Sequence, residues 1–250
     1  MQLLALDTST ETLSIAVQRL VDGQVRVWQH SEPGGAQTST RLIPAIQTLL
    51  AQAGLTVGQL DAIAFGCGPG SFTGLRTACS VAQGLAFGAA AHAPDGRSMP
   101  VLPVDTLLAV AEEARFQHAP QTAPLQVLSL LDARMDEMYV GRYRYADGHW
   151  TQLEDFNLMR PEDLAPQPLW LLAGNVWDAY GQRLPASASL GFKTLPTASA
   201  VLRLAPQLLA QGAAIDPALA LPRYIRDKVA KTTQERAVER NLATQGAMLP

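Results

Sequence analysis

One pattern of strands and turns occurs twice along the 250-residue chain, and it limits the folds that the chain can adopt. In each half, a short apolar run ends at an acidic residue, and two further strand-like segments joined by an Asp-Gly pair follow. Asp-Gly between such segments predicts a tight hairpin turn. The pattern therefore predicts three antiparallel strands at the start of each half, over residues 3–6, 13–20 and 25–28 and again over 127–131, 138–145 and 150–158.

Units of helix and strand follow each set of three strands. Leu and Ile residues at helical spacing predict a helix over 37–53 that begins at Thr38 or Ser39 and ends at Gly54. Thr106 is expected to cap a later helix. The other expected elements are strands over 61–66, 101–104 and 168–173, helices over 72–89, 106–116 and 198–211, and a turn over 95–97.

The two halves share few identical residues, so we interpret the pattern as a structural duplication. It predicts an α/β protein with an N-terminal lobe of residues 1–117 and a C-terminal lobe of residues 118–226. Residues 227–250 form a charged tail, which we expect to be a solvated helical end or a docking segment.

Composition narrows the function classes. Apolar residues make up 48% of the chain and charged residues 16%, which is typical of a globular protein with a large core. The net charge of −3 argues against strong, autonomous RNA binding. The first ten residues are interpreted as a buried strand and not as a signal peptide. The two cysteines, 12 residues apart, suggest neither a disulfide framework nor a zinc site, so a reduced, cytoplasmic protein is expected.

The run GCGPGSFTGLR, over residues 66–76, joins a predicted strand to a predicted helix. Such a run either cradles a phosphate at the helix start or supplies special backbone angles. It lacks the GK[ST] of a P-loop. Asp7 either orients a metal-bound water or holds an Asx turn, and the turn is favoured. The candidate ligand-binding residues are Asp7, Thr8, Gly68, Gly70 and Ser71.

No catalytic constellation is evident in the sequence. The four histidines lie too far apart to form an HxxxH pair, and neither a GxSxG elbow nor a Cys–His arrangement stands out. We therefore predict no catalytic residue, no resident metal and no cofactor. The helix over 72–89 carries small residues on every face, which is compatible with a partner interface or with ordinary core packing.

Five segments together resemble the bacterial TsaB (YeaZ) family: LDTST at 6–10, GCGPGSFTGLR at 66–76, AQGLA at 82–86, DARMDEMY at 132–139 and PRYIR at 222–226. The resemblance spans roughly residues 2–230. It implies an ASKHA (actin/Hsp70/sugar-kinase-like) fold of two duplicated lobes, each a mixed sheet with flanking helices. It also implies a role in forming threonylcarbamoyladenosine beside the anticodon of tRNAs that read codons starting with A.

In that pathway, the resemblance implies, the catalytic paralogue TsaD holds a metal through paired histidines. The comparable segment here, PVLPVDTLL at 100–108, has no histidine. TsaB proteins act as partners of TsaD and, with the ATPase TsaE, form the working complex. One departure is Gln37-Thr38, where the family often carries Glu-His.

Two alternatives stay open: an enzyme acting on its own, as an ASKHA-type kinase or a Gcp-like metallopeptidase, and a self-associating structural protein. The turn at 132–135 lacks the glycine with which a kinase would approach phosphate.

The two helices over 37–53 and 72–89 are expected to form the surface that meets TsaD. The same surface is expected to form a homodimer when TsaD is absent, and tRNA is expected to reach this chain only through the complex. Ala82 and Ala86 are predicted to lie on its exposed side. The expected interface residues are Leu42, Ile46, Leu49, Phe72, Thr73, Leu75, Arg76, Cys79, Ala82, Gln83 and Ala86.

Overall fold

The computed structural model describes residues 1–35, 37–91, 98–166 and 168–226. The expected turn at 95–97 and the charged tail at 227–250 lie outside these ranges. Within them, no helix combines the length and the apolar character that crossing a membrane requires.

The first sheet has five strands in the order β3-β2-β1-β4-β5. Its first three strands are antiparallel, and β4 and β5 continue the sheet parallel to β1. Asp22 and Gly23, both at positive φ, form the predicted Asp-Gly turn of the hairpin. The strands are β1 (Leu3–Asp7), β2 (Thr12–Val21), β3 (Gln24–Pro33), β4 (Ala62–Gly68) and β5 (Val101–Asp105).

The second sheet repeats this topology. Its order is β11-β10-β6-β7-β8, so β8-β7-β6-β10-β11 corresponds to β3-β2-β1-β4-β5. The predicted duplication and the ASKHA-type two-lobe fold are thus confirmed. The expected strand over 150–158 is two strands, because β9 pairs separately with β7. The strands are β6 (Leu125–Asp132), β7 (Met138–Ala146), β8 (His149–Gln152), β9 (Asn157–Met159), β10 (Leu171–Gly174) and β11 (Phe192–Lys193).

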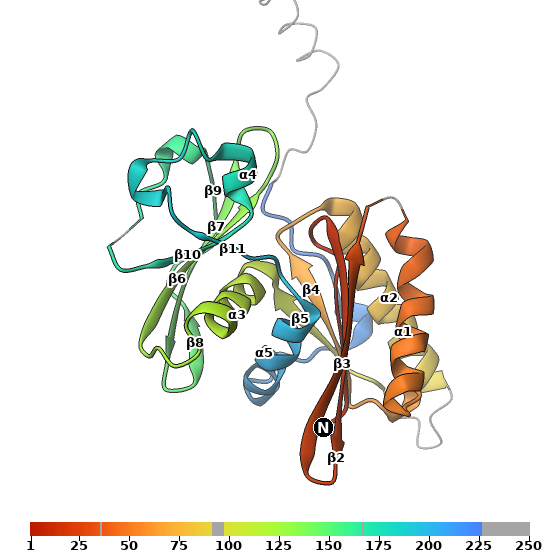
Figure 1. Ribbon diagram of the computed structural model, residues 1–250. Helices are drawn as coiled ribbons and strands as arrows, with labels where there is room; N and C mark the ends of the chain where they lie inside the picture. The colour runs from red at the N-terminus through yellow and green to blue at the C-terminus, as the bar shows by residue number, and fades with distance from the viewer. Residues whose placement is uncertain (36, 92–97, 167, 227–250) are drawn as a thin grey trace, which may run out of the picture.

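The helices form two layers against the first sheet, as Figure 1 shows. Helices α1 and α2 cover one face, and α3 and α5 lie between the two sheets. The helix α5 packs on the first sheet although it follows the second one in sequence. The helices are α1 (Thr38–Ala53), α2 (Phe72–Ala91), α3 (Thr106–His118), α4 (Val176–Tyr180) and α5 (Ala198–Ala210), with short 3₁₀ helices η1 (Val57–Gln59), η2 (Pro161–Asp163), η3 (Ala186–Ala188) and η4 (Pro217–Leu219).

Two predicted helix ends were tested by the structure. Gly54 ends α1 in a left-handed conformation, with φ of 64°, as expected. Thr106 does not cap α3: it lies inside the helix, Asp105 is the N-cap residue, and the Thr106 hydroxyl is buried with no partner among the described residues. The cap prediction was wrong because Thr106 is drawn into the core, where it is 0% exposed.

After α5, residues 213–226, here called the C-terminal strap, cross back over the N-terminal lobe. Ile215 forms an isolated bridge with Val101 of β5. Further along, the amide of Arg223 donates to the carbonyl of Cys67 on β4 at 2.7 Å. After the second lobe, the chain therefore contacts the first lobe twice, once through α5 on the first sheet and once through the strap.

Candidate functional site

Asp7 ends β1 in a fully buried position. One carboxylate oxygen, Oδ1, accepts hydrogen bonds from the Ser9 amide at 2.9 Å and the Ser9 hydroxyl at 2.6 Å. Burial raises the pKa of Asp7 to about 6, and these two bonds lower it by less than burial raises it. The geometry is the Asx-type turn that was favoured from sequence. The described residues contain no group of three or more His, Cys, Asp or Glu placed to hold a metal ion.

The glycine-rich run packs against the turn that follows β1. A Cβ on Gly70 would lie 2.5 Å from the carbonyl oxygen of Ser9, and one on Gly68 would lie 2.4 Å from the carbonyl oxygen of Arg223. The Ser71 amide donates to the Ser9 carbonyl at 2.7 Å, and the Thr8 hydroxyl donates to the Gly74 carbonyl at 2.7 Å. Gly68 and Gly70 therefore serve close backbone approach, which is the second of the two alternatives raised from sequence.

A cleft of about 530 Å³ lies between the two lobes. Its N-terminal wall comes from the β1–β2 turn and the start of α2, and its C-terminal wall comes from the β6–β7 turn. Sequence reasoning missed cleft-lining side chains on both sides: Thr10 and Glu11 of the N-terminal lobe, and, facing them, Arg134, Met135, Tyr139, Asn175 and Arg226.

The β6–β7 turn is left-handed without any glycine, because Arg134, Met135 and Asp136 have φ of 61°, 55° and 63°. Its amides bond within the turn: Arg134 donates to Asp132 Oδ1 at 2.7 Å, and Glu137 donates to the Arg134 carbonyl at 3.2 Å. The absence of glycine from residues 132–135 did not prevent a left-handed backbone in this turn. The amides of Arg134 and Glu137 nevertheless already have acceptors within the turn, so they are not free for phosphate.

Most of the predicted interface residues are core residues. Ala82 and Ala86 are 0% exposed, which corrects the prediction that they face outward. These side chains form the stripe that packs each helix on the first sheet, and small residues on α2 let it approach the sheet closely. The buried members of the prediction are Leu42, Ile46, Leu49, Leu75, Cys79, Ala82 and Ala86.

The C-terminal strap contacts three more of the predicted interface residues, of which Arg76 remains exposed. The Gln83 side chain donates to the carbonyl oxygens of Pro217 and Ala220, at 2.8 and 3.2 Å. Tyr224 stacks on Phe72 with ring centroids 4.9 Å apart and accepts a 2.8 Å hydrogen bond from Arg76 Nε. Thr73 is exposed and lines the interlobe cleft. Phe72, Arg76 and Gln83 therefore make contacts within the chain itself.

The strap also joins the two lobes through its arginines. Arg223 Nη1 lies 3.2 Å from Asp105 Oδ1 at the end of β5. Arg226 donates to the Arg134 carbonyl at 3.2 Å and pairs with Glu137, both on the β6–β7 turn. In the sequence, Arg223 and Arg226 stand out only as part of the PRYIR segment that carries the family resemblance. No local pattern indicates which residues they contact.

Two large apolar side chains do point outward from the paired helices. Ile43 of α1 is 43% exposed and Phe87 of α2 is 49% exposed. Both helices lie side by side on the same face of the first sheet (Figure 1). These two residues, absent from the prediction, are the apolar anchors that this helix face offers to solvent or to a partner.

Comparison with known proteins places these features in a family. Residues 28–239 match the family model described as TsaD, tRNA N6-adenosine threonylcarbamoyltransferase. The chain is 34% identical to the tRNA threonylcarbamoyladenosine biosynthesis protein TsaB of Escherichia coli over 92% of this chain and 96% of that protein. It is 35% identical to the TsaB protein of Haemophilus influenzae, over 91% and 94% of the two chains.

Solved structures agree with this relationship. YeaZ from Pseudomonas aeruginosa superposes with a TM-score of 0.75 at 35% sequence identity, covering 90% of this chain and 99% of that one. The similarity to TsaB and YeaZ proteins thus covers nine-tenths of this chain or more. The chain belongs to the TsaB (YeaZ) family.

Proposed function

We propose that this chain acts in tRNA threonylcarbamoyladenosine synthesis as the non-catalytic partner and activator of TsaD, in a complex that also contains TsaE. The observation that carries the proposal is the similarity to TsaB proteins along more than nine-tenths of the chain. At the β5–α3 junction, where the resemblance places the paired metal-binding histidines of TsaD, this chain has Asp105, Thr106, Leu107 and Leu108.

The side chains and backbone amides at the two turns favour a non-catalytic role over catalysis. The buried carboxylate of Asp7, at the first turn, accepts hydrogen bonds from Ser9. Several backbone amides of the glycine-rich run and of the β6–β7 turn already donate to acceptors within the protein, so these amides are not available to a phosphate. A kinase needs such amides free to grip a nucleotide. The net charge of −3 supports contact with tRNA through the complex and not by this chain alone.

We further propose that the outward face of α1 and α2, anchored by Ile43 and Phe87, meets TsaD and forms a homodimer when TsaD is absent. Exposed apolar side chains on two adjacent helices fit a helix pair from another chain. A second copy of the chain offers the same pair, so homodimer and heterodimer would compete for one surface.

Reconstitution tests the role. Purified TsaD, TsaE and this chain are mixed with tRNA and threonylcarbamoyl adenylate, and the tRNA nucleosides are analysed by mass spectrometry. We expect the modified nucleoside only when TsaD and this chain are both present. Turnover by this chain alone, abolished by Asp7→Ala, would instead identify an enzyme, and equal turnover without this chain would remove the activator role.

A variant pair tests the surface. Phe87→Arg is expected to give a folded monomer that no longer captures TsaD. Leu190→Arg is the matched control, because Leu190 is 87% exposed on the other lobe. Size-exclusion mass and TsaD capture are measured for both variants. If Phe87→Arg still pairs like the control, the surface lies elsewhere.

A further inference from the structure

A second pocket, of about 530 Å³, lies where the β7–β8 hairpin meets α3 and α5. It is at the opposite end of β7 from the interlobe cleft: Tyr145, near the end of the strand, lines the pocket, whereas Tyr139, near its beginning, lines the cleft. Figure 1 shows β8 and α5 at the lower end of the molecule. A pocket of this volume accommodates a small molecule.

One buried carboxylate, that of Glu112, orders both arginines that line this pocket. It accepts hydrogen bonds from Arg115 Nε and Nη2, both at 2.9 Å, and from Arg203 Nε at 2.7 Å. Trp150 Nε1 donates a further hydrogen bond to it at 2.9 Å. The Arg115 guanidinium also lies 4.5 Å above the ring of Tyr145. Both guanidinium groups are thus fixed in advance, so a ligand that binds them loses little affinity to side-chain ordering.

The side chains of the pocket have more hydrogen-bond donors than acceptors. Each oxygen of Glu112 already accepts two hydrogen bonds. Arg203 uses Nε for Glu112 and Nη2 for Glu113, and its Nη1 has no acceptor among the residues that the structure describes. The Tyr145 hydroxyl has no hydrogen-bond partner in that part of the chain either. Since a guanidinium carries five N–H donors, the group that complements this pocket is an acceptor.

Apolar groups form the rest of the pocket wall. The rings of Tyr145 and Trp150, with centroids 5.1 Å apart, lie on one side, and Leu204 and Ala210 of α5 lie on the other. The Gln207 side chain bonds both the amide and the carbonyl of Trp150, each at 2.9 Å. Because Gln207 occupies these groups on β8, an added peptide strand does not fit there, and a small ligand does.

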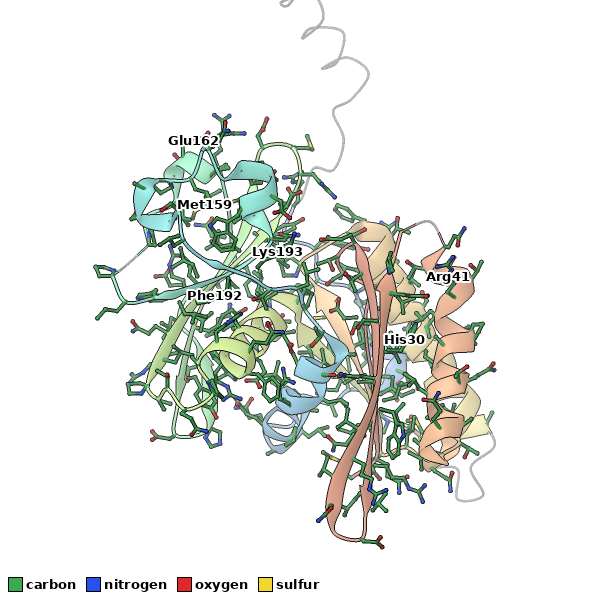
Figure 2. The ribbon with its side chains drawn as sticks, viewed as in Figure 1. His30, Arg41, Met159, Glu162, Phe192 and Lys193 are labelled. Carbon is green, nitrogen blue, oxygen red and sulfur yellow. The ribbon has the colours of Figure 1, made fainter. Side chains whose placement is uncertain are left out.

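Another aromatic pair of the second lobe lacks this arrangement. His118 stacks on Phe192 with ring centroids 3.9 Å apart, and Phe192 belongs to β11 at the opposite edge of the sheet from β8 (Figure 2). The neighbouring cation there, Lys193, is paired with Asp178. An apolar ligand finds aromatic rings at both edges, but two ordered guanidinium groups lie only in the pocket beside β8, of these two places.

We propose that this pocket binds a small organic carboxylate with an apolar body. Arg203 Nη1 and the Tyr145 hydroxyl donate to the carboxylate, and the aromatic and aliphatic side chains contact the body. A monoanion fits better than a phosphate dianion, because Glu112 and Glu113 already offset much of the charge of the two arginines. The site lies apart from the interlobe cleft and is independent of the proposed partnership with TsaD.

NMR of the full-length chain tests the proposal. The reporter is the indole N–H of Trp150, which donates to Glu112 and is assigned through its nuclear Overhauser contacts with the neighbouring rings of Tyr143 and Tyr145. Benzoate, benzamide and phenyl phosphate are titrated separately at constant ionic strength. We expect a saturable shift with benzoate. Benzamide keeps the ring but lacks the charge, so it should bind at least about tenfold more weakly, and phenyl phosphate should also bind more weakly than benzoate.

Two variants probe the head-group contact and the cavity. Arg203→Lys keeps the positive charge beside Glu112 and Glu113 but removes the Nη1 donor, and it should weaken benzoate binding about tenfold. Ala210→Phe fills the pocket from the exposed end of α5 and should abolish binding. Ala51→Phe is the matched control, because Ala51 is an exposed alanine near the end of α1. Ala210 takes no part in the ion pairs, so its variant tests the site even if Arg203→Lys melts at a lower temperature.

The outcomes separate the alternatives. Saturable benzoate binding that is lost in Ala210→Phe and kept in Ala51→Phe, with both variants melting as the native protein does, supports the site. Equal binding of benzoate and benzamide would show that the pocket takes any aromatic ring, and tighter binding of phenyl phosphate would assign it a different head group; both overturn the proposal. Absence of a saturable shift with benzoate, or native affinity in Arg203→Lys or in Ala210→Phe, would overturn it as well.

Discussion

A Cβ atom on Gly74 would lie 1.8 Å from the carbonyl oxygen of Thr8, and the Thr8 hydroxyl donates to the Gly74 carbonyl at 2.7 Å. The start of α2 is thus pressed against the turn after β1 at the backbone level. The contact holds the β1–β2 turn against the start of α2, and both of these segments line the interlobe cleft.

Gly74→Ala should destabilise the protein. The added methyl group overlaps main-chain atoms that have no room to shift, and overpacking of this kind costs about 1–3 kcal/mol or more. Gly84→Ala is the matched control in the same helix, because a Cβ there meets nothing within 4 Å. It should stabilise the helix by about 1 kcal/mol. Urea unfolding of both variants measures the difference, and equal effects would contradict the close approach.

Asp7 should make stability fall as the pH rises from about 4 to 6. Its pKa rises from 3.8 to about 6 on folding, so the folded state binds a proton more tightly than the unfolded state does. The cost of ionising the buried group is absent below pH 3.8 and fully present above pH 6, where it amounts to about 3 kcal/mol.

Asp7→Asn removes the titrating group and should flatten this part of the pH profile. Asp22→Asn, in the exposed β2–β3 turn, serves as the control and should leave the profile unchanged. The free energy of unfolding is measured at pH 5 and pH 7.5 for all three proteins. An unchanged profile in Asp7→Asn would show that the carboxyl does not titrate in this range.

Ala82→Arg should disrupt folding. Ala82 lies in the core between α2 and the first sheet, where an arginine would be both too large and unpaired. Burying an unpaired charge is expected to cost at least about 3–5 kcal/mol. Phe87→Arg, one and a half turns further along the same helix, should keep the native melting temperature. Circular dichroism melting of the two variants separates the core face of α2 from its outer face.

Glu112→Gln should strongly destabilise the contact between α3, α5 and β8. The Glu112 carboxylate, 3% exposed, accepts hydrogen bonds from Arg115 at 2.9 Å, from Arg203 at 2.7 Å and from Trp150 at 2.9 Å. Removing the charge leaves Arg115 without its carboxylate partner and leaves Arg203 with Glu113 alone, which is expected to cost about 3 kcal/mol.

Glu154→Gln is the control for this network, because Glu154 is an exposed partner of Arg142 and should contribute less than about 1 kcal/mol. Burial raises the pKa of Glu112, but the hydrogen bonds from Arg115, Trp150 and Arg203 outweigh burial and lower the pKa overall. The contribution of Glu112 to stability is therefore present at neutral pH and is lost as the pH falls. Thermal melting should show Glu112→Gln approaching the native protein only at acidic pH, whereas Glu154→Gln should stay close to the native protein at both neutral and acidic pH.

Local sequence determined much of the fold. The Asp-Gly turns at 22–23 and 147–148 adopt positive φ as expected, and the strands they join form at the predicted positions. Gly54 ends α1 as its lack of a Cβ permits. These features depend on φ, ψ preferences and on the period of apolar residues over a few positions, so they can be inferred without knowing what packs against them.

Whether a residue of α1 or α2 is exposed depends on contacts between segments that are far apart in the sequence, and no local pattern contains that information. The small residues of α2 were compatible with a partner interface or with core packing, and Ala82 and Ala86 were wrongly predicted to lie on the exposed side, whereas they are 0% exposed. The strap, and not another chain, contacts Gln83. Arg76 meets Tyr224 across 148 residues of sequence. The sequence by itself determined the strands, helices and tight turns, because these follow from local backbone preferences and from the spacing of apolar residues. Only the tertiary structure decided which segments cover the helices and which turns face each other across the interlobe cleft, because those contacts depend on how distant segments are oriented in space.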